Sequence, residues 1–170
     1  MSLELVLDPS RRDHSASFIV AASDADALAI LELQKRAYQS EASLYNDWTI
    51  PPLLQSLESL RQEIGSISVL KAVEGDTIVG SVRAALRDRT CLVGKLIVEP
   101  ALQRRGIGGA LLQAVEALFP QAEAFELFTG SRSDGNIRLY RRHGYQDAGT
   151  KWVSVQLTFV IMRKQAATAA

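Results

Sequence analysis

The apolar run at residues 91–98, CLVGKLIV, constrains the fold more than any other stretch of the chain. It is mostly apolar on both faces, which is typical of a strand buried at the centre of a sheet. Gly94 within the run indicates a bulge. A helix from about Arg105 to Leu118, ended by Pro120, follows closely. A central strand that leads into a helix favours a layered α/β fold.

The rest of the chain predicts further strands and helices. The expected strands are residues 17–22, 66–73, 77–87, 124–130 and 151–162, with a hairpin turn at EGD between the second and third. The expected helices run from a cap at Ser23 to about Tyr38, over 50–64, and over 134–144, where Gly144 closes the last. One face of the final strand is expected to carry Val153, Val155, Leu157, Phe159 and Ile161. We infer a mixed α/β sheet with helices on its faces.

Length and composition predict one globular domain. The chain has 170 residues, of which 47% are apolar and 22% charged. No apolar run approaches the ~20 residues that span a bilayer, and the N-terminus lacks the pattern of a secretory signal. The single Cys91 excludes an internal disulfide and a cysteine metal cage. A reducing, cytoplasmic setting is therefore expected.

Charge is unevenly distributed although the formal net charge is zero. A net charge of zero argues against general affinity for nucleic acid. Residues 1–64 carry ten acidic and five basic side chains. The opposite bias occurs at Arg104, Arg105, Arg132, Arg138, Arg141 and Arg142. One part of the molecule therefore suits an anion and another a cation, the alternative being a plain solvated surface.

The turn after the buried strand, residues 103–110 (QRRGIGGA), has the character of an anion site. The first amides of a helix lack intrahelical partners, and the helix dipole adds partial positive charge there. Glycines let an anion approach the backbone, and the arginines add mobile positive charge. The turn predicts a pyrophosphate cradle made mainly of main-chain N–H groups. The alternative is a tight strand-to-helix turn with surface arginines.

Two familiar phosphate-binding spacings do not fit this turn. A P-loop needs a Lys and Ser/Thr pair after its glycines, and no such pair follows here. A dinucleotide-binding G-x-G-x-x-G that began at Gly106 would need a glycine where Leu111 stands. The turn therefore belongs to neither class.

A second motif, NIRLYRRHGY, lies downstream at residues 136–145. A buried strand into Val98-x-Pro100, then Gln103-x-x-Gly106-x-Gly108, and later this motif, resemble the GNAT superfamily of CoA-dependent N-acyltransferases. The resemblance covers residues 17–164, with 1–16 as an N-terminal extension and 165–170 as a flexible tail. It implies a single α/β domain whose mixed, mostly antiparallel central sheet is splayed in the middle, with helices on both faces.

The resemblance also implies how each matching residue meets acetyl-CoA. Backbone groups of the strand end would pair with the pantetheine arm, and amides of the turn would bind the pyrophosphate. Tyr140 would point at the thioester sulfur as the catalytic residue, and Asn136 would contact the cofactor. The implied binding residues are Leu96, Ile97, Val98, Gln103, Arg104, Arg105, Gly106, Ile107, Gly108, Gly109, Ala110, Asn136 and Tyr140. Four-residue spacing places Asn136 and Tyr140 on one helix face; the alternatives are a helix cap and a core tyrosine.

The implied reaction is transfer of an acetyl group from acetyl-CoA to a primary amine by direct attack in a ternary complex. Such an amine, with a pKa of about 10.4, is mostly protonated at pH 7, so the site should hold a base or a water path to one. Some family members carry a glutamate where Leu92 stands here. The candidates left are Glu32, Glu41, Glu99 and Glu126, with Tyr38 and Tyr45 for a water path. His143 is expected to be a helix-end charge and Cys91 inert core.

The acceptor is left open between a small-molecule amine and an amine of a protein or peptide. The segment YQSEASLYNDWTIPP, residues 38–52, shapes the acceptor site in the family, and its acidic and aromatic side chains suit a cation. We expect a monomer or homodimer that binds no nucleic acid, membrane or metal. The competing interpretations are a CoA-binding sensor or interaction module without catalysis, and a nucleotide-binding protein of another fold.

Overall fold

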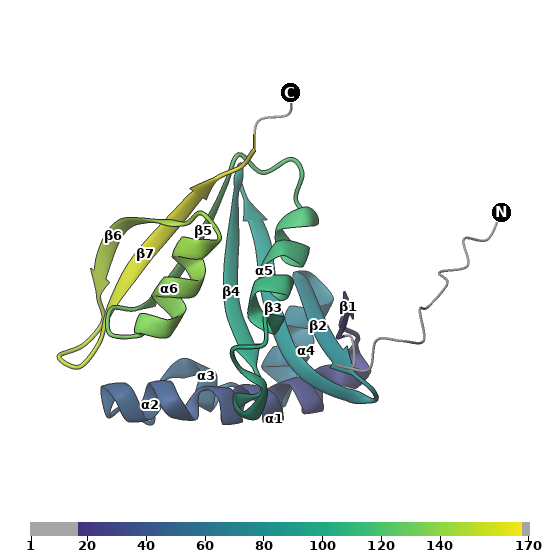
Figure 1. Cartoon of the computed structure of the whole chain (residues 1–170). Helices are drawn as coiled ribbons and strands as arrows, with labels where there is room; N and C mark the ends of the chain where they lie inside the picture. Colours follow the sequence, from purple (N-terminus) through teal and green to yellow (C-terminus); the bar gives the residue numbers. More distant parts are fainter. Residues whose placement is uncertain (1–16, 168–170) are drawn as a thin grey trace, which may run out of the picture.

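A seven-stranded sheet organises residues 17–167, the part of the chain that this computed structural model describes. The strand order is β1-β2-β3-β4-β5-β7-β6 (Figure 1). The strands are β1 (Phe18–Ala21), β2 (Ser68–Glu74), β3 (Thr77–Arg87), β4 (Thr90–Val98), β5 (Ala124–Gly130), β6 (Gln146–Trp152) and β7 (Thr158–Gln165). The helices are α1 (Ala27–Ala37), α2 (Gln39–Tyr45), α3 (Pro51–Leu54), α4 (Leu57–Ser66), α5 (Ile107–Ala117) and α6 (Asp134–Arg142), with 3-10 turns at Asp24–Asp26 and Pro100–Leu102. The expected extension 1–16, and 168–170 of the expected tail, lie outside the described residues.

The sheet is splayed between β4 and β5. These strands are the one parallel pair among the neighbours, and only Thr90–Leu92 pair with Ala124–Glu126. Beyond these residues β4 continues to Val98 and β5 to Gly130 without pairing with each other. The two strands diverge in Figure 1. The expected mixed, mostly antiparallel and splayed sheet is confirmed.

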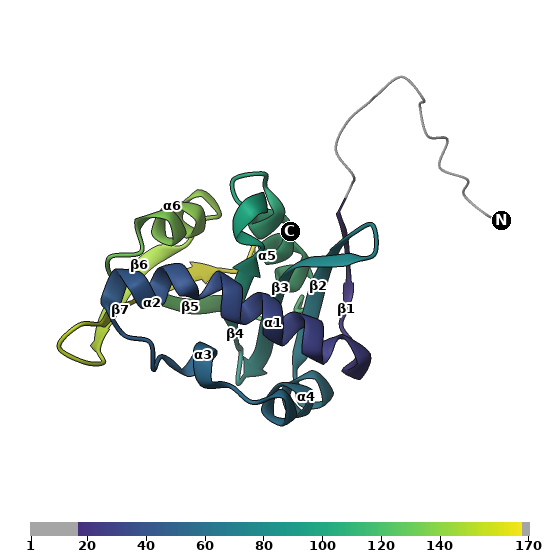
Figure 2. The ribbon, with the colours of Figure 1, turned by 90° about the horizontal axis from the view of Figure 1, so that it is seen from below.

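Helices cover both faces of the sheet. α5 packs against β2, β3 and β4, and α1 packs against β3 and β4. Alternation along β3 separates the two layers, because Gly80 meets α5 whereas the Arg83 side chain meets α1 and α4. Figure 2 shows α1 and α2 following one another across the strands. The helix layer that leads to α2 therefore passes beneath the splayed half of the sheet.

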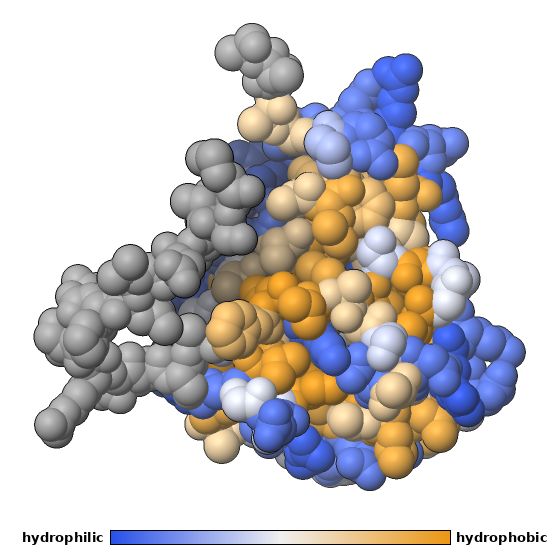
Figure 3. All heavy atoms as spheres, turned by 90° about the vertical axis from the view of Figure 1, so that its right-hand side faces the viewer, coloured by the Kyte–Doolittle hydropathy of each residue, from blue (hydrophilic) through white to orange (hydrophobic). Residues whose placement is uncertain are grey.

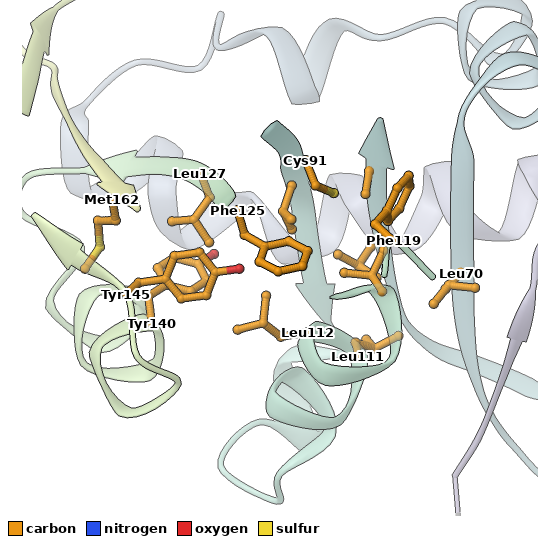
Figure 4. Close-up of a cluster of buried hydrophobic side chains, with 14 of the residues drawn as sticks. Leu70, Cys91, Leu111, Leu112, Phe119, Phe125, Leu127, Tyr140, Tyr145 and Met162 are labelled. Atoms are coloured by element: carbon orange, nitrogen blue, oxygen red, sulfur yellow. The ribbon is translucent and has the colours of Figure 1, made fainter. Parts of the chain in front are cut away.

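The main core lies between the sheet and the α5–α6 layer. Leu111 and Leu112 of α5 are fully buried, and the cluster continues through Phe125 to Tyr140 and Tyr145 (Figure 4). A smaller core lies between α1, α4 and β2, and its buried members are Ala27, Ile30, Leu31, Leu60 and Val69. Both helix layers are thus anchored independently to the sheet.

A buried polar cluster ties α1 and α4 to β3. The Arg83 side chain is 3% exposed, and its Nη1 donates to Glu63 Oε2 at 2.6 Å and to Gln55 Oε1 at 3.1 Å. Its Nη2 donates to Gln34, which also donates to Gln55 at 3.0 Å. Burial lowers the pKa of Arg83, while Glu63 opposes that shift. The guanidinium therefore depends on these partners for its charge.

Two sequence expectations are wrong in detail. Residues 50–64 form two helices instead of one, because Gln55 and Ser56 are extended, with ψ of 133° and 158°. Ser56 caps α4 by accepting from Ser59 N at 3.1 Å. The break frees Gln55 to join Arg83, so a tertiary hydrogen bond overrides the helical pattern.

Residues 151–162 form part of a hairpin instead of a single strand. β6 and β7 are antiparallel neighbours, and residues 153–157 connect them. Val153 N donates to Leu157 O at 3.0 Å, and Val155 at the tip is 92% exposed. The predicted common face of Val153, Val155, Leu157, Phe159 and Ile161 is therefore wrong. The alternation of apolar and polar residues in the sequence continues through the turn, so the sequence gives no sign of it.

The opposite edge of the sheet is formed by β1. Its outward side chains Phe18 and Val20 are 69% and 47% exposed. Figure 3 shows apolar side chains gathered on the side of the molecule that carries β1 and β2. This apolar edge is far along the sheet from the gap between β4 and β5.

The close approach of α5 to β3 can be tested at Gly80. A Cβ there would lie 2.8 Å from Leu111 Cδ1 and 3.0 Å from the Ile97 carbonyl oxygen. We expect Gly80→Ala to lower the free energy of unfolding by about 1–3 kcal/mol through overpacking. Gly65→Ala on α4 is the control: no atom lies within 4 Å of its Cβ, so we expect a gain of about 0.5–1 kcal/mol. Urea denaturation followed by circular dichroism measures both, and equal effects would contradict this packing.

Candidate functional site

β4 presents an unpaired backbone edge in the splayed half of the sheet. On one side β4 pairs with β3, but on the other side β5 departs after Leu92. The β3–β4 pair has a register shift that falls between Gly94 and Ile97 on β4, where Lys95 has a φ of 49°. The bulge predicted from Gly94 thus lies directly after it. The edge at Leu96–Val98 therefore has N–H and C=O groups available to an extended partner.

The glycine-rich turn places the N-terminus of α5 just past the end of β4. Gly106 is the N-cap residue with a φ of 86°, and Arg104 also has a positive φ of 64°. The first intrahelical bond runs from Ala110 N to Gly106 O at 3.0 Å. The amides of Ile107–Gly109 therefore have no intrahelical acceptor. The turn combines free donors with the exposed backbone expected of an anion site.

Polar side chains surround this turn. Gln103, Arg104 and Arg105 are exposed. Arg105 Nη1 lies 3.8 Å from Glu74 Oε1, a loose pair, and Arg104 has no carboxylate within 4 Å among residues 17–167. The arginines thus add positive charge around the α5 amides.

α5 and α6 pack together through glycines. A Cβ on Gly109 would lie 2.7 Å from His143 Nε2, and a Cβ on Gly108 would lie 3.4 Å from Leu139 Cδ2. His143 is half-buried at the end of α6. The glycines of the turn therefore serve a second purpose, because they bring α6 beside the start of α5.

α6 carries the two predicted residues Asn136 and Tyr140. The N-cap is Ser133, so Asn136 is not a cap. Asn136 Nδ2 donates to Thr129 Oγ1 at 3.3 Å, at the end of β5. Asn136 is half-buried and Tyr140 is 7% exposed. Both side chains lie on the α6 face that turns toward β5 and the core.

Tyr140 combines a buried ring with a hydroxyl that has no hydrogen-bond partner in the described part of the chain. The ring packs edge-on against Tyr145, with centroids 6.1 Å apart (Figure 4). Within residues 17–167, the fully buried side-chain polar atoms without a partner are Glu74 Oε2 and Arg83 Nε. The Tyr140 hydroxyl has no hydrogen bond to these residues and is not in that set, so it keeps some exposure. It is free to donate to a ligand.

The pKa of Tyr140 is raised, chiefly by burial, and the negative charges of Tyr38 and Glu41 raise it further. Burial also raises the pKa of Tyr38 to about 12. Ionisation of Tyr140 is therefore harder than for an ordinary phenol, whose pKa of about 10 already exceeds that of a thiol at about 8.5. Full proton transfer from this hydroxyl to a thiolate is therefore uphill, whereas donation of a hydrogen bond needs no ionisation.

Glu41 of α2 reaches the start of α6. Ser133 Oγ donates to Glu41 Oε2 at 2.7 Å. Tyr45 Oη lies 2.9 Å from Ser133 Oγ and accepts from Arg132 N at 2.9 Å. The structure thus brings the predicted residues Glu41 and Tyr45 together through Ser133, which sequence reasoning missed. Its only local signal, a serine before Asp134, is that of a helix cap.

The other candidate bases are placed elsewhere. Glu99 Oε2 pairs with Arg36 at 2.8 Å, and Glu126 Oε2 pairs with Arg163 at 3.0 Å. Glu32 is exposed on α1. Cys91 is buried, and burial raises its pKa to about 11. A neutral buried thiol fits the expectation of inert core.

A family model described as an acetyltransferase (GNAT) domain matches residues 34–166. The chain belongs to the GNAT acetyltransferase family. The match includes β4, the glycine-rich turn of α5 and all of α6. No curated protein sequence matches the chain.

Solved structures share the fold at low identity. PaiA N-acetyltransferase of Thermoplasma acidophilum, solved with coenzyme A, has a TM-score of 0.76 at 16% identity and covers 89% of this chain and 99% of its own. The ribosomal-protein-S18-alanine N-acetyltransferase of Escherichia coli has a TM-score of 0.75 at 16% identity, over 91% and 97%. YncA of Salmonella typhimurium, solved with acetyl-CoA, has a TM-score of 0.72 at 22% identity, over 92% and 97%. These likenesses establish the fold of this GNAT domain.

Residues 17–167 show neither a membrane span nor a metal site. None of their helices is long and apolar enough to cross a bilayer. None of their His, Cys, Asp and Glu side chains form a group of three suited to a metal ion.

The buried tyrosines predict an unusual alkaline titration. Burial raises the pKa of Tyr38, Tyr140 and Tyr145, three of the four tyrosines. At about pH 10.5, we expect the tyrosinate absorbance of the native protein to be less than half that in denaturant, since unfolded phenols ionise near pH 10. The unfolding free energy should fall above about pH 10, because the unfolded chain loses these protons first. Circular dichroism controls for folding, and equal native and denatured titrations would contradict this account.

Proposed function

We propose that the protein is an N-acetyltransferase that moves an acetyl group from acetyl-CoA to a primary amine by direct attack in a ternary complex. One observation carries the proposal. The unpaired edge of β4 ends beside the free amides of α5, and the Tyr140 hydroxyl on α6 has no hydrogen-bond partner among residues 17–167. A backbone edge, an anion site and a donor are the three features that an acyl-CoA thioester requires.

The pantetheine arm of acetyl-CoA, the acyl donor, fits this arrangement as an added strand. We propose that Leu96–Val98 hydrogen-bond with the amides of pantetheine in the gap that β5 leaves. The amides from Arg104 to Gly109 then meet the pyrophosphate, supported by the α5 dipole and the side chains of Gln103 and Arg105. The Ala110 amide, which was also expected to bind there, instead donates to Gly106 O at 3.0 Å. Asn136, whose Nδ2 is held by Thr129, contacts the cofactor from α6.

The transfer step follows from ordinary acyl chemistry. The ammonium first loses a proton, and the free amine attacks the thioester carbon. The C–N bond forms and the C–S bond breaks, which yields an N-acetyl amide and CoA thiol. Of the two protons that nitrogen loses, one ends on sulfur and one in solvent. Tyr140 donates a hydrogen bond to the leaving thiolate, and the backbone N–H near Val98 stabilises the oxyanion.

Similar proteins support an amine as the acceptor. Two of the structural neighbours are N-acetyltransferases, one of them acting on the alanine of a ribosomal protein. We propose either a small-molecule amine or an amine of a protein or peptide here. A second candidate function, a CoA-binding module without catalysis, is favoured by Leu92, which fills the position where some family members carry a glutamate.

Thiol release separates these two functions. We expect CoA thiol to appear when the protein is mixed with acetyl-CoA and a reactive member of an amine panel, at a rate that depends on both substrates. Coenzyme A should also raise the Tm, whereas ATP and NAD should not, because only a ligand of the native state stabilises it. A Tm shift without thiol release from any amine would favour the non-catalytic module. A shift with ATP or NAD alone would overturn both.

Tyr140→Phe tests the donor role. We expect kcat to fall at least about tenfold while the Kd for coenzyme A changes little, since the hydroxyl acts on the leaving sulfur in the transition state. Tyr145→Phe is the matched control: Tyr145 packs against Tyr140 but donates to Glu116 Oε1 at 2.8 Å. It should cost about 1 kcal/mol of stability and leave kcat unchanged. A kcat for Tyr140→Phe within twofold of wild type would exclude the role.

A further inference from the structure

Glu41 differs from the other half-buried carboxylates in residues 17–167. Six of the eight pair with a lysine or arginine, namely Asp26, Glu63, Glu74, Glu99, Glu116 and Glu126. Asp47 accepts two hydrogen bonds from Thr49 within its own turn. Glu41 has neither arrangement, because no cation of the described chain lies within 4 Å of it and its one donor is Ser133. A half-buried carboxylate without a cation is costly.

The carboxylate of Glu41 is held in a fixed position. Since the Ser133 proton goes to Glu41 Oε2, the Tyr45 hydroxyl donates to Ser133 Oγ and itself accepts from Arg132 N. The Arg132 guanidinium lies over the Tyr45 ring, 5.8 Å from its centroid, instead of on Glu41. The nearby cation is thus used elsewhere, and Oε1 of Glu41 is left without a partner among the described residues.

The position of Tyr45, and with it that of Glu41, depends on the end of β5. Tyr45 occupies the space above Gly130 at the end of β5, where a Cβ would lie 2.0 Å from the Tyr45 hydroxyl oxygen. α2 therefore packs on the end of β5 and on Arg132 and Ser133, which immediately precede α6. This places Glu41 at the same end of β5 as Thr129, which holds Asn136.

The position of Glu41 relates it to Tyr140. Glu41 is held by Ser133 immediately before α6, the helix that carries Tyr140, and its negative charge contributes to the raised pKa of both Tyr140 and Tyr38. Tyr38 stands at the joint of α1 and α2, three residues before Glu41. A cation on Glu41 would therefore lie close to the group that we assign to the leaving sulfur.

We propose that Glu41 is the binding group for the ammonium of the acceptor amine, with Ser133 and Tyr45 as its positioning residues. This inference rests on the proposed function and specifies its acceptor. One carboxylate oxygen is held by Ser133, and the other receives the ammonium. The acceptor is then a cationic amine, and an uncharged alcohol of the same shape is rejected, because it leaves Glu41 without its counter-charge.

Glu41→Gln tests the proposal with little change of shape, since the amide oxygen can still accept from Ser133. We expect KM for the amine to rise about 10- to 100-fold, as for loss of a charge partner, while KM for acetyl-CoA and the Tm stay near wild type. Ser133→Ala should raise KM for the amine by a smaller factor, because the carboxylate remains but is less fixed. Glu58→Gln, at an exposed position of α4, is the control for lost negative charge and should change nothing.

Calorimetry reads the same interaction without turnover. Protein loaded with coenzyme A is titrated with alaninamide and phenethylamine, and with lactamide and phenethyl alcohol as their uncharged counterparts. Wild type should bind at least one amine about tenfold more tightly than its alcohol, and Glu41→Gln should lose that preference.

The outcomes separate this inference from the proposed function. An unchanged amine KM in an active Glu41→Gln enzyme overturns the role of Glu41 and leaves the acetyltransferase intact. Absence of any amine preference in the wild-type titration also overturns it. If no amine releases thiol but Glu41→Gln abolishes amine preference, the ammonium site stands and the proposed catalysis falls.

Discussion

The divergence of β4 from β5 is the feature on which the rest of the site depends. A strand whose neighbour departs keeps its polar backbone groups, and each must find water or another partner. β4 can leave β5 because β3 pairs along its length, with a bulge at Lys95 that turns the free edge. β5 in turn is held by β7 and is covered at its end by Tyr45. The gap is therefore a consequence of pairing on the outer sides of both strands.

The buried charge of Arg83 fixes the helix layer that contains α1 and α4, from which α2 and the proposed acceptor site continue. Arg83 is almost fully buried, and its two terminal nitrogens donate to Gln34 on α1, Gln55 after α3, and Glu63 on α4. Removing one partner of such a group leaves an uncompensated charge, so the cluster admits few alternative placements of α1. α1 leads directly into Tyr38 and α2. The contacts of Arg83 that fix the position of α1 therefore also fix where Glu41 of α2 lies. Stability and the proposed acceptor binding by Glu41 would thus be coupled through α1.

The sequence predicted the parts of the site that are local in the chain. The buried strand, the turn and α5 follow one another within thirty residues, about the length of one supersecondary unit, and the spacing of Asn136 and Tyr140 fixes their common face. The Glu41–Ser133 contact joins residues 92 apart, and neither residue carries a local pattern that names the other. The break at Gln55 and the turn at Val155 were missed for a related reason. A tertiary hydrogen bond to Arg83 decides the backbone at Gln55, whereas hydrogen bonds among residues 153–157 close a turn that the apolar alternation concealed.

The charge of Glu41 links the proposed ammonium site to Tyr140. Burial alone keeps its hydroxyl neutral, and the negative charge of Glu41 raises its pKa further. If Glu41 binds the acceptor ammonium as proposed, the bound cation offsets the charge of Glu41 and its contribution to the raised pKa of Tyr140. The proposed hydrogen bond from Tyr140 to the leaving sulfur would then be stronger with the acceptor in place. Such coupling would disfavour release of the thiolate to water in a complex that holds acetyl-CoA alone.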